Sequence, residues 1–258
     1  MGLLQSLLAI TAGFLAGVIN TVAGSGSLIT LPVLILLGLP PTVANGTNRI
    51  GVILQNTVAG FSFSRSKALD IRGALILSIP AILGSILGAQ IAVNLDEEMM
   101  ERVIGAVMVI MLFVIWLRPQ RWLEGKLDSL SGPISLTQII SMFMIGAYGG
   151  FIQAGVGIFL LAALVLFVGY DLVRANAVKI VIILVFTLFS LFVFAQNDQV
   201  NWGIGVLLGS GNMLGAWLAA RLTVKKGAGW VRQLLMATVA LSAIYLFGFF
   251  DWLARFFG

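Results

Sequence analysis

The feature that most constrains this chain is its succession of long apolar segments, with charged residues almost entirely between them. Of the 258 residues, 60% are hydrophobic and 10% are charged, whereas an average soluble domain carries about 25% charged residues. A helix needs roughly 20 residues to cross about 30 Å of hydrocarbon. Apolar segments fall at 3–23, 27–39, 42–63, 73–94, 100–117, 134–153, 157–169, 172–195, 203–220 and 233–250. The sequence therefore predicts an all-α integral membrane protein.

Two of the segments, 27–39 and 157–169, are too short to cross a bilayer. Each has 13 residues, which as a helix reach about 20 Å. Each also follows a glycine cluster, Gly24-Ser25-Gly26 in one case and Gly155-Val156-Gly157 in the other. Because glycines at such positions interrupt helices, we expect each short segment to form a broken helix pair with the segment before it.

The sequence repeats itself. A shift of 131 residues places Ala23, Gly24, Gly26, Gly38, Ala44 and Asn45 on identical residues, and a shift of 127 does the same for Gly84, Gly88 and Ala89. The matches occur in the same order in both halves. They predict two repeats, each a broken helix pair plus three transmembrane helices, at 1–118 and 134–258, joined by a cytoplasmic linker at 119–133.

Loop charge predicts how the repeats are oriented. The loop 64–72 has three positive residues and its repeat partner, 195–202, has none; the loop 94–102 has one and its partner, 221–232, has four. The positive-inside rule then places 64–72, 118–133 and 221–232 in the cytoplasm and 94–102 and 195–202 outside. The repeats are therefore expected to have inverted topology in the cytoplasmic (inner) membrane, with both termini outside. Residues 1–24 lack a basic n-region, so no cleaved signal peptide is expected.

Inverted repeats with broken helices are typical of transporters that bind their substrate at mid-membrane. A helix that begins after a break directs its free N–H groups, and the positive end of its dipole, at an anion. Polar side chains gather at both breaks, so the candidate binding residues there are Asn20, Gly24, Ser25, Gly26, Gln153 and Gly155. The alternatives are that the glycines serve only close helix packing, or that the protein is a membrane scaffold or accessory subunit without cargo.

Two cations lie inside apolar segments. Arg49 is eight residues past Pro41, and Lys179 is eight past Asp171, so each is about 12 Å from a helix start. Charged groups at such depth normally face a cavity or a partner, although snorkelling towards the headgroups is the alternative. Their polar neighbours, the remaining candidate binding residues, are Asn45, Thr47, Asn48 and Asn176.

The residue types that the apolar segments lack exclude several kinds of chemistry. All ten acidic residues fall in loops or at segment ends, and the chain has no histidine and no cysteine. We therefore expect no metal site, no cofactor and no enzymatic activity, and no coupling through a buried carboxylate. The expected partners are a small anion and membrane lipid. Apart from Arg49 and Lys179, the positive residues lie in short loops or near segment ends, so nucleic acid is not expected as a partner. A homodimer is compatible with the sequence without being required by any motif.

The stretch GFLAGVINTVAGSGSLITLPVLILLGLPPTVANGTNR at 13–49 resembles the TauE/SafE sulfite exporter family, also called the four-TMS sulfonate uptake permease family. The stretch GGFIQAGVGIFLLAALVLFVGYDLVRANAVK at 149–179 resembles the second copy of the family's motif, which is usually richer in glycine and proline where Val156, Ile158 and Phe159 stand here. The resemblance implies a transporter of sulfite or small organosulfonates, with the site at the residues named above other than Arg49. It is expected to work by alternating access with the anion bound at midplane; an anion channel or uniporter for small oxyanions is the alternative.

Overall fold

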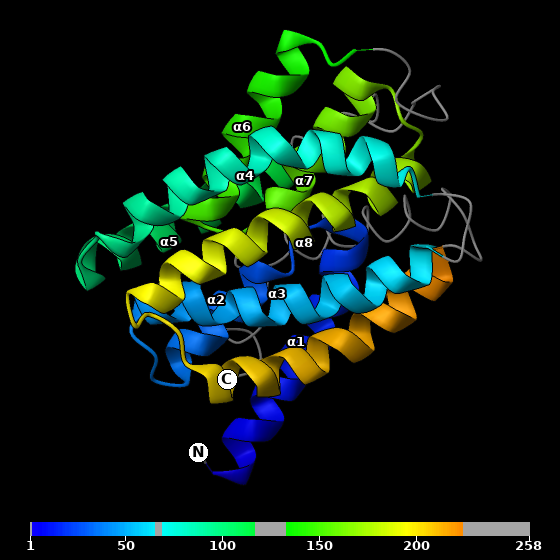
Figure 1. Ribbon diagram of the computed structural model, residues 1–258. Coiled ribbons are helices and arrows are strands. Elements are labelled where there is room, and N and C mark those ends of the chain that lie inside the picture. Colours follow the sequence, from blue (N-terminus) through cyan, green and yellow to red (C-terminus); the bar gives the residue numbers. More distant parts are fainter. Residues whose placement is uncertain (1, 65–68, 117–132, 224–258) are drawn as a thin grey trace.

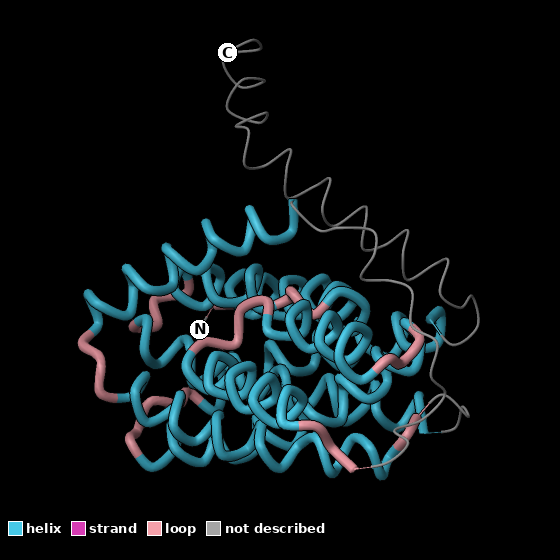
Figure 2. Tube along the Cα trace, turned by 90° about the horizontal axis from the view of Figure 1, so that it is seen from above, coloured by secondary structure: helices cyan, strands magenta, loops and turns pink. Residues whose placement is uncertain are grey.

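The computed structural model describes residues 2–64, 69–116 and 133–223, and this part of the chain consists of helices joined by short loops, with no strand (Figures 1 and 2). Four of its helices are long and apolar enough to cross a membrane: Leu3–Ala23, Ile71–Val93, Leu172–Gln196 and Trp202–Thr223. The protein is therefore a multi-pass helical membrane protein.

The helices follow the predicted segments closely. In the first half they are α1 (Leu3–Ala23), α2 (Ser27–Leu36), α3 (Pro41–Ser64), α4 (Ile71–Val93) and α5 (Glu97–Trp116). In the second half they are α6 (Leu136–Phe151), α7 (Val156–Ala163) with its π-helical continuation η2 (Leu164–Val168), α8 (Leu172–Gln196) and the helix Trp202–Thr223. Nearly all of the predicted linker 119–133, and the whole predicted span 233–250, lie outside the described residues.

Polar residues between the apolar segments start the helices. Asp70 accepts a hydrogen bond from the backbone of Gly73 at the start of α4, and Asp171 accepts two at the start of α8. Ser135 and Gln138 form a capping box at the start of α6. Each cap satisfies backbone N–H groups that the helix itself leaves unpaired. The outer faces remain apolar: Leu83 and Met144, for example, are each 60% exposed, as side chains that face lipid should be.

Glycines bring the two halves into close contact. Gly84 and Gly88 of α4 lie against the backbone of α6 at Phe143 and Ala147, where the two helices run side by side (Figure 1). In the same way, Gly211 and Gly215 of Trp202–Thr223 lie against the backbone of α1, at positions 10 to 18. Each half thus packs its glycine pair on the first helix of the other half.

Replacing Gly88 with alanine tests this packing. A Cβ at Gly88 would lie 1.9 Å from the carbonyl oxygen of Ala147, and overpacking of this kind costs about 1–3 kcal/mol. We expect a lower melting temperature in detergent. The matched control is Gly105→Ala in α5, where a Cβ meets nothing within 4 Å and higher helix propensity adds up to about 1 kcal/mol. Equal melting temperatures for the two variants would contradict the tight α4–α6 contact.

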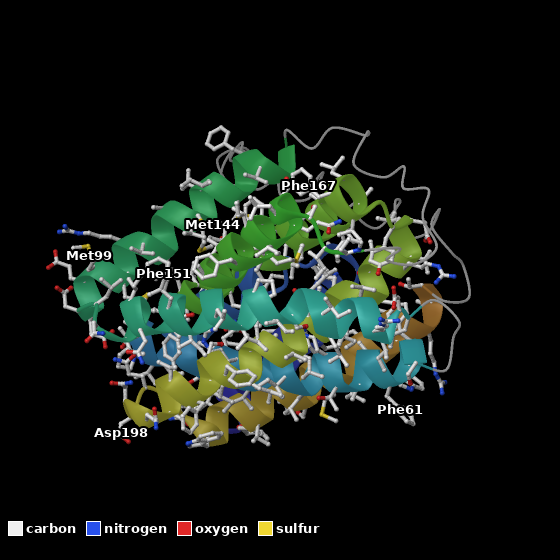
Figure 3. All side chains as sticks on the ribbon, turned by 45° about the horizontal axis from the view of Figure 1, so that its top comes forward. Phe61, Met99, Met144, Phe151, Phe167 and Asp198 are labelled. Atoms are coloured by element: carbon white, nitrogen blue, oxygen red, sulfur yellow. The ribbon has the colours of Figure 1, made fainter. Side chains whose placement is uncertain are left out.

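The loops gather at two ends of the helix bundle. Met99 and Asp198 lie at one end, and Phe61 lies at the other (Figure 3). At the first end the side chain of Gln199 donates to the backbone oxygen of Val93 at 3.0 Å. At the other end the Tyr170 hydroxyl donates to Asp70 at 2.6 Å. The two loops that the charge pattern assigns to the outside, 94–102 and 195–202, therefore lie together.

Candidate functional site

Both predicted helix breaks are present. Between α1 and α2, Gly24 adopts a left-handed conformation with φ of 77°. Between α6 and α7, Gly155 does the same with φ of 73°. This region is open to glycine and strained for residues with a side chain, so the glycines permit the chain to stop one helix and start the next inside the protein.

The two breaks touch each other. The backbone N–H of Gly157 donates to the carbonyl oxygen of Gly24 at 3.2 Å. A Cβ on Gly24 would lie 2.3 Å from the Cα of Gly157, and a Cβ on Gly157 would lie 2.4 Å from the Cα of Gly24. Neither residue can carry a side chain in this arrangement. The glycine clusters, 131 residues apart in the sequence, thus form one feature at the interface of the two halves.

Helix α3 holds the start of α2 in place. The Asn48 amide donates to the hydroxyl of Ser27 at 3.0 Å, and its oxygen accepts from the hydroxyl of Thr30 at 2.6 Å. All three side chains are buried. Ser27, Thr30 and Asn48 therefore form one hydrogen-bonded group that ties α2 to α3.

Arg49 of α3 is fully buried and reaches into the second half. Its terminal nitrogens donate to the carbonyl oxygens of Gly149 and Gly150 at 3.1 and 2.6 Å, and to the side chains of Gln153 and Ser190 at 3.3 and 2.8 Å. Its guanidinium carbon also lies 4.4 Å from the centre of the Phe194 ring. Because the carbonyls belong to the last turn of α6, Arg49 places its positive charge at the negative end of that helix dipole.

Lys179 makes the equivalent contact in the opposite direction. Its ammonium donates to the carbonyl oxygens of Asn20 and Thr21 at 3.4 and 3.3 Å, in the last turn of α1. Asn45 adds an amide contact at the α6 end, where Nδ2 donates to the oxygen of Phe151 at 2.8 Å. Each half thus supplies a cation to the broken helix of the other half.

Several buried polar atoms around the end of α1 and Lys179 have no hydrogen-bond partner. They include both side-chain atoms of Asn176, the hydroxyl of Thr21 and the hydroxyl of Ser25. On the Arg49 side, Nε of the guanidinium and Oδ1 of Asn45 are also without a partner. Arg49 and Lys179 are both 0% exposed, so neither cation reaches towards headgroups and the snorkelling alternative does not describe them. Buried polar groups without partners are uncommon, so these atoms are candidates for contact with a ligand or water.

Three other residues that the sequence proposed for the site, Gln153, Gly26 and Thr47, have different surroundings. Gln153 lies within the Arg49 group and also donates to the Thr187 hydroxyl at 2.7 Å, while Gly26 packs against α1 at Ala16. Thr47 stands apart, because its hydroxyl accepts from the backbone of Asn201 at 2.8 Å. Thr187 and Ser190 were not predicted from the sequence. The signal available for them was two hydroxyls three residues apart in the otherwise apolar stretch 180–195.

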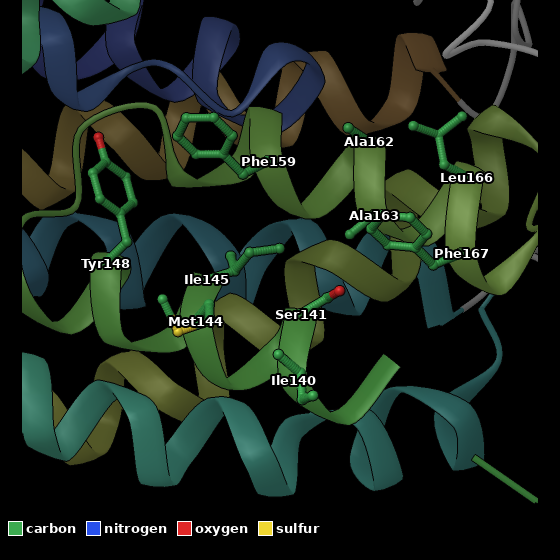
Figure 4. Close-up of a pocket in the computed structure, with 10 residues that line it drawn as sticks. All are labelled: Ile140, Ser141, Met144, Ile145, Tyr148, Phe159, Ala162, Ala163, Leu166 and Phe167. Carbon is green, nitrogen blue, oxygen red and sulfur yellow. The ribbon is translucent and has the colours of Figure 1, made fainter. Parts of the chain in front are cut away.

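Two further features help to define the site. Over the described residues no group of three or more His, Cys, Asp or Glu side chains lies close enough to hold a metal ion. A groove of about 530 Å³ between α6 and α7–η2 is lined mainly by apolar side chains, among them Ile140, Met144, Phe159 and Leu166 (Figure 4). In a membrane protein such a surface faces acyl chains. None of the polar candidate residues lines this groove.

Comparison with known proteins adds the family. The model of the family described as "Sulfite exporter TauE/SafE" matches residues 9–246. The chain belongs to the TauE/SafE family. A "Probable membrane transporter protein" of Haemophilus influenzae is 30% identical over 224 residues, covering 87% of each chain. The "Probable membrane transporter protein ORF9" of Sinorhizobium sp is 26% identical over 236 residues, covering 91% of this chain and 89% of its own.

The "Probable membrane transporter protein YfcA" of Escherichia coli K12 is also similar, with 26% identity over 233 residues, 90% of this chain and 86% of its own. No solved structure matches the chain. As a TauE/SafE family member with multiple spans, this protein is a membrane transporter. The resemblance found in the two glycine-rich stretches is therefore confirmed at the level of the family.

Proposed function

We propose that this TauE/SafE protein transports sulfite or small organosulfonate anions across the cytoplasmic membrane by alternating access. The observation that carries the proposal is the contact of the two helix breaks, Gly24 with Gly157, together with the two fully buried cations Arg49 and Lys179. The anion binds beside the breaks, where helix N-termini and amide or hydroxyl groups meet its oxygens. Lys179 neutralises its charge, and Arg49 adds a second buried positive charge at the end of α6.

Charge supports an anionic substrate. The partners of Arg49 in the described part of the chain are carbonyl and side-chain oxygens and an aromatic ring, with no carboxylate among them. A buried cation without a carboxylate leaves a net positive field inside the protein, and a small anion is the ligand that such a field attracts.

The packing of the two halves supports inverted repeats that rock against each other. Helix α4 packs on α6, and Trp202–Thr223 packs on α1, so the contacts are reciprocal. Met99 and Asp198, in the two loops assigned to the outside, lie at the opposite end of the bundle from Phe61, which precedes a loop assigned to the cytoplasm (Figure 3). In transporters built from inverted repeats, access alternates when one repeat moves against the other around a fixed site. We propose the same movement here, with both termini outside.

A thermal-shift screen tests the proposed function. The detergent-purified protein is heated with sulfite, sulfate, thiosulfate, sulfoacetate, taurine, phosphate or chloride. A ligand bound only to the folded state stabilises it by about 2.7 kcal/mol at a hundred times its dissociation constant. We expect sulfite or sulfoacetate to raise the melting temperature, and Lys179→Ala to lose the effect while remaining folded.

The same screen identifies the outcomes against the proposal. If no anion raised the melting temperature, the protein would have a neutral or cationic cargo, or none. A second experiment, which measures anion flux into liposomes that contain the protein, distinguishes alternating access from a channel. Saturable uptake of sulfite without single-channel currents supports alternating access, whereas measurable single-channel currents would favour an anion channel or uniporter.

A further inference from the structure

The two buried cations are not equivalent. Arg49 makes four hydrogen bonds through its terminal nitrogens, the shortest at 2.6 and 2.8 Å, and packs against Phe194. The bonds from Lys179 to the α1 carbonyls are longer, at 3.3 and 3.4 Å. Since N–H···O bonds in proteins cluster between about 2.7 and 3.2 Å, the contacts of Lys179 with α1 are the weaker ones.

The surroundings also differ in the described part of the chain: Arg49 Nε and Asn45 Oδ1 lack a partner on the Arg49 side, but more polar atoms lack one around Lys179 and the end of α1. One turn before Lys179, on the same face of α8, the Asn176 amide has neither its nitrogen nor its oxygen in a hydrogen bond. Thr21, whose carbonyl oxygen accepts from Lys179, has a hydroxyl without a partner. The amide of Asn176 and the hydroxyl of Thr21 supply donors, and both side chains are fully buried. These groups suit the oxygens of one small anion beside the ammonium.

We propose that the anion site is the group formed by Lys179, Asn176 and Thr21, and that Lys179 exchanges its α1 carbonyl partners for the anion when substrate binds. Arg49 remains a fixed cap on the last turn of α6. In transporters with broken helices, the carbonyl ends of the half-helices bind coupling cations. Here two side chains of the protein itself lie at these carbonyl ends, and we expect the longer bonds from Lys179 to α1 to be the ones that exchange. This inference rests on the proposed anion transport.

The exchange has a mechanical consequence. Lys179 links α8 to the end of α1, where Asn20 and Ser25 are buried. When an anion binds the Lys179 ammonium in place of the α1 carbonyl oxygens, the link between α8 and the broken helix of the other half weakens. Substrate binding thereby weakens one contact between the repeats while the Arg49 contact and the glycine contacts remain, which allows a hinge movement instead of a separation of the two halves.

The test measures two quantities for each variant. The first is the sulfite or sulfoacetate concentration that gives half of the maximal thermal shift, and the second is the melting temperature without anion. Lys179→Gln and Thr21→Val should raise these concentrations at least tenfold, while Lys179→Arg retains a response because the charge remains. Asn176→Asp places a carboxylate beside Lys179. It should abolish the response and raise the melting temperature without anion, because the buried cation gains a tethered counter-ion.

The matched controls loosen Arg49 without removing its charge. Ser190→Ala deletes the 2.8 Å bond and Phe194→Leu deletes the ring contact; both should melt earlier but keep the wild-type sulfite response. The division of roles is overturned if these controls lose the response as strongly as Lys179→Gln, or if Asn176→Asp retains it. A wild type that responds to no anion would overturn this inference together with the proposed function, whereas a responding wild type with the wrong variant pattern overturns this inference alone.

Discussion

Gly24→Ala is expected to destabilise the protein by about 3 kcal/mol or more, since overpacking costs about 1–3 kcal/mol and a strained backbone position about 1–3 kcal/mol. Both effects act at this residue. Its φ of 77° is unfavourable for alanine, and the new Cβ would lie 2.3 Å from the Cα of Gly157. We expect a large fall in the melting temperature, followed by the fluorescence of the six tryptophans in detergent, and loss of transport.

Alanine variants of two other glycines separate the effect of backbone strain from the effect of the clash. Gly38 has φ of 92° with nothing within 4 Å of the position that a Cβ would take, so Gly38→Ala introduces strain without a clash. Gly157→Ala introduces a clash at 2.4 Å without a positive φ. We expect Gly157→Ala to be more harmful than Gly38→Ala. If Gly24→Ala were no worse than Gly38→Ala, the two breaks would not be in contact in the folded protein.

Arg49→Met is expected to have the second large effect. It leaves the carbonyl oxygens of Gly149 and Gly150, and the hydroxyl of Ser190, without the donor that they have now. Each buried acceptor left unsatisfied costs about 1–3 kcal/mol, and removing the buried charge offsets part of this. We expect a net loss of roughly 3 kcal/mol, which corresponds to a fall of about 6–12 °C in melting temperature.

The control is an arginine of the same size at the surface. Arg102 pairs with Glu98 one turn away, and its side chain is 71% exposed. Exposed pairs of this kind contribute about 0–1 kcal/mol, so Arg102→Met should melt within a few degrees of the wild type. Equal stability of the Arg49 and Arg102 variants would show that the α6 cap contributes nothing to the fold.

The helices could be predicted from the sequence. Apolar runs bounded by Asp70 or Asp171 indicated their limits within a few residues, because a helix in lipid must satisfy its own backbone and has to be about as long as the membrane is thick. Both breaks were predicted as well, since glycine clusters at Gly24 and Gly155 were followed by segments too short to span. The distribution of loop charge led to an expectation for orientation, which stays a prediction.

The candidate site could be predicted only in part. Sequence spacing singled out Arg49 and Lys179 as buried cations, because charges inside apolar segments are rare. Spacing offered no means of assigning their partners, since Gly149 is 100 residues from Arg49 and Asn20 is 159 from Lys179 along the chain. Thr187 and Ser190 were missed because a hydroxyl in an apolar segment usually bonds to its own helix.

Residue types and their order are enough to establish a helical membrane protein with two interrupted helices and an interior that contains cations and amides. The contact between the breaks, the reach of each cation into the other half, and the unpartnered Asn176 beside Lys179 follow from the three-dimensional packing. The reason is physical: periodicity and burial in lipid act locally along the chain, whereas hydrogen bonds between α3 and α6 or between α8 and α1 depend on how the two halves pack.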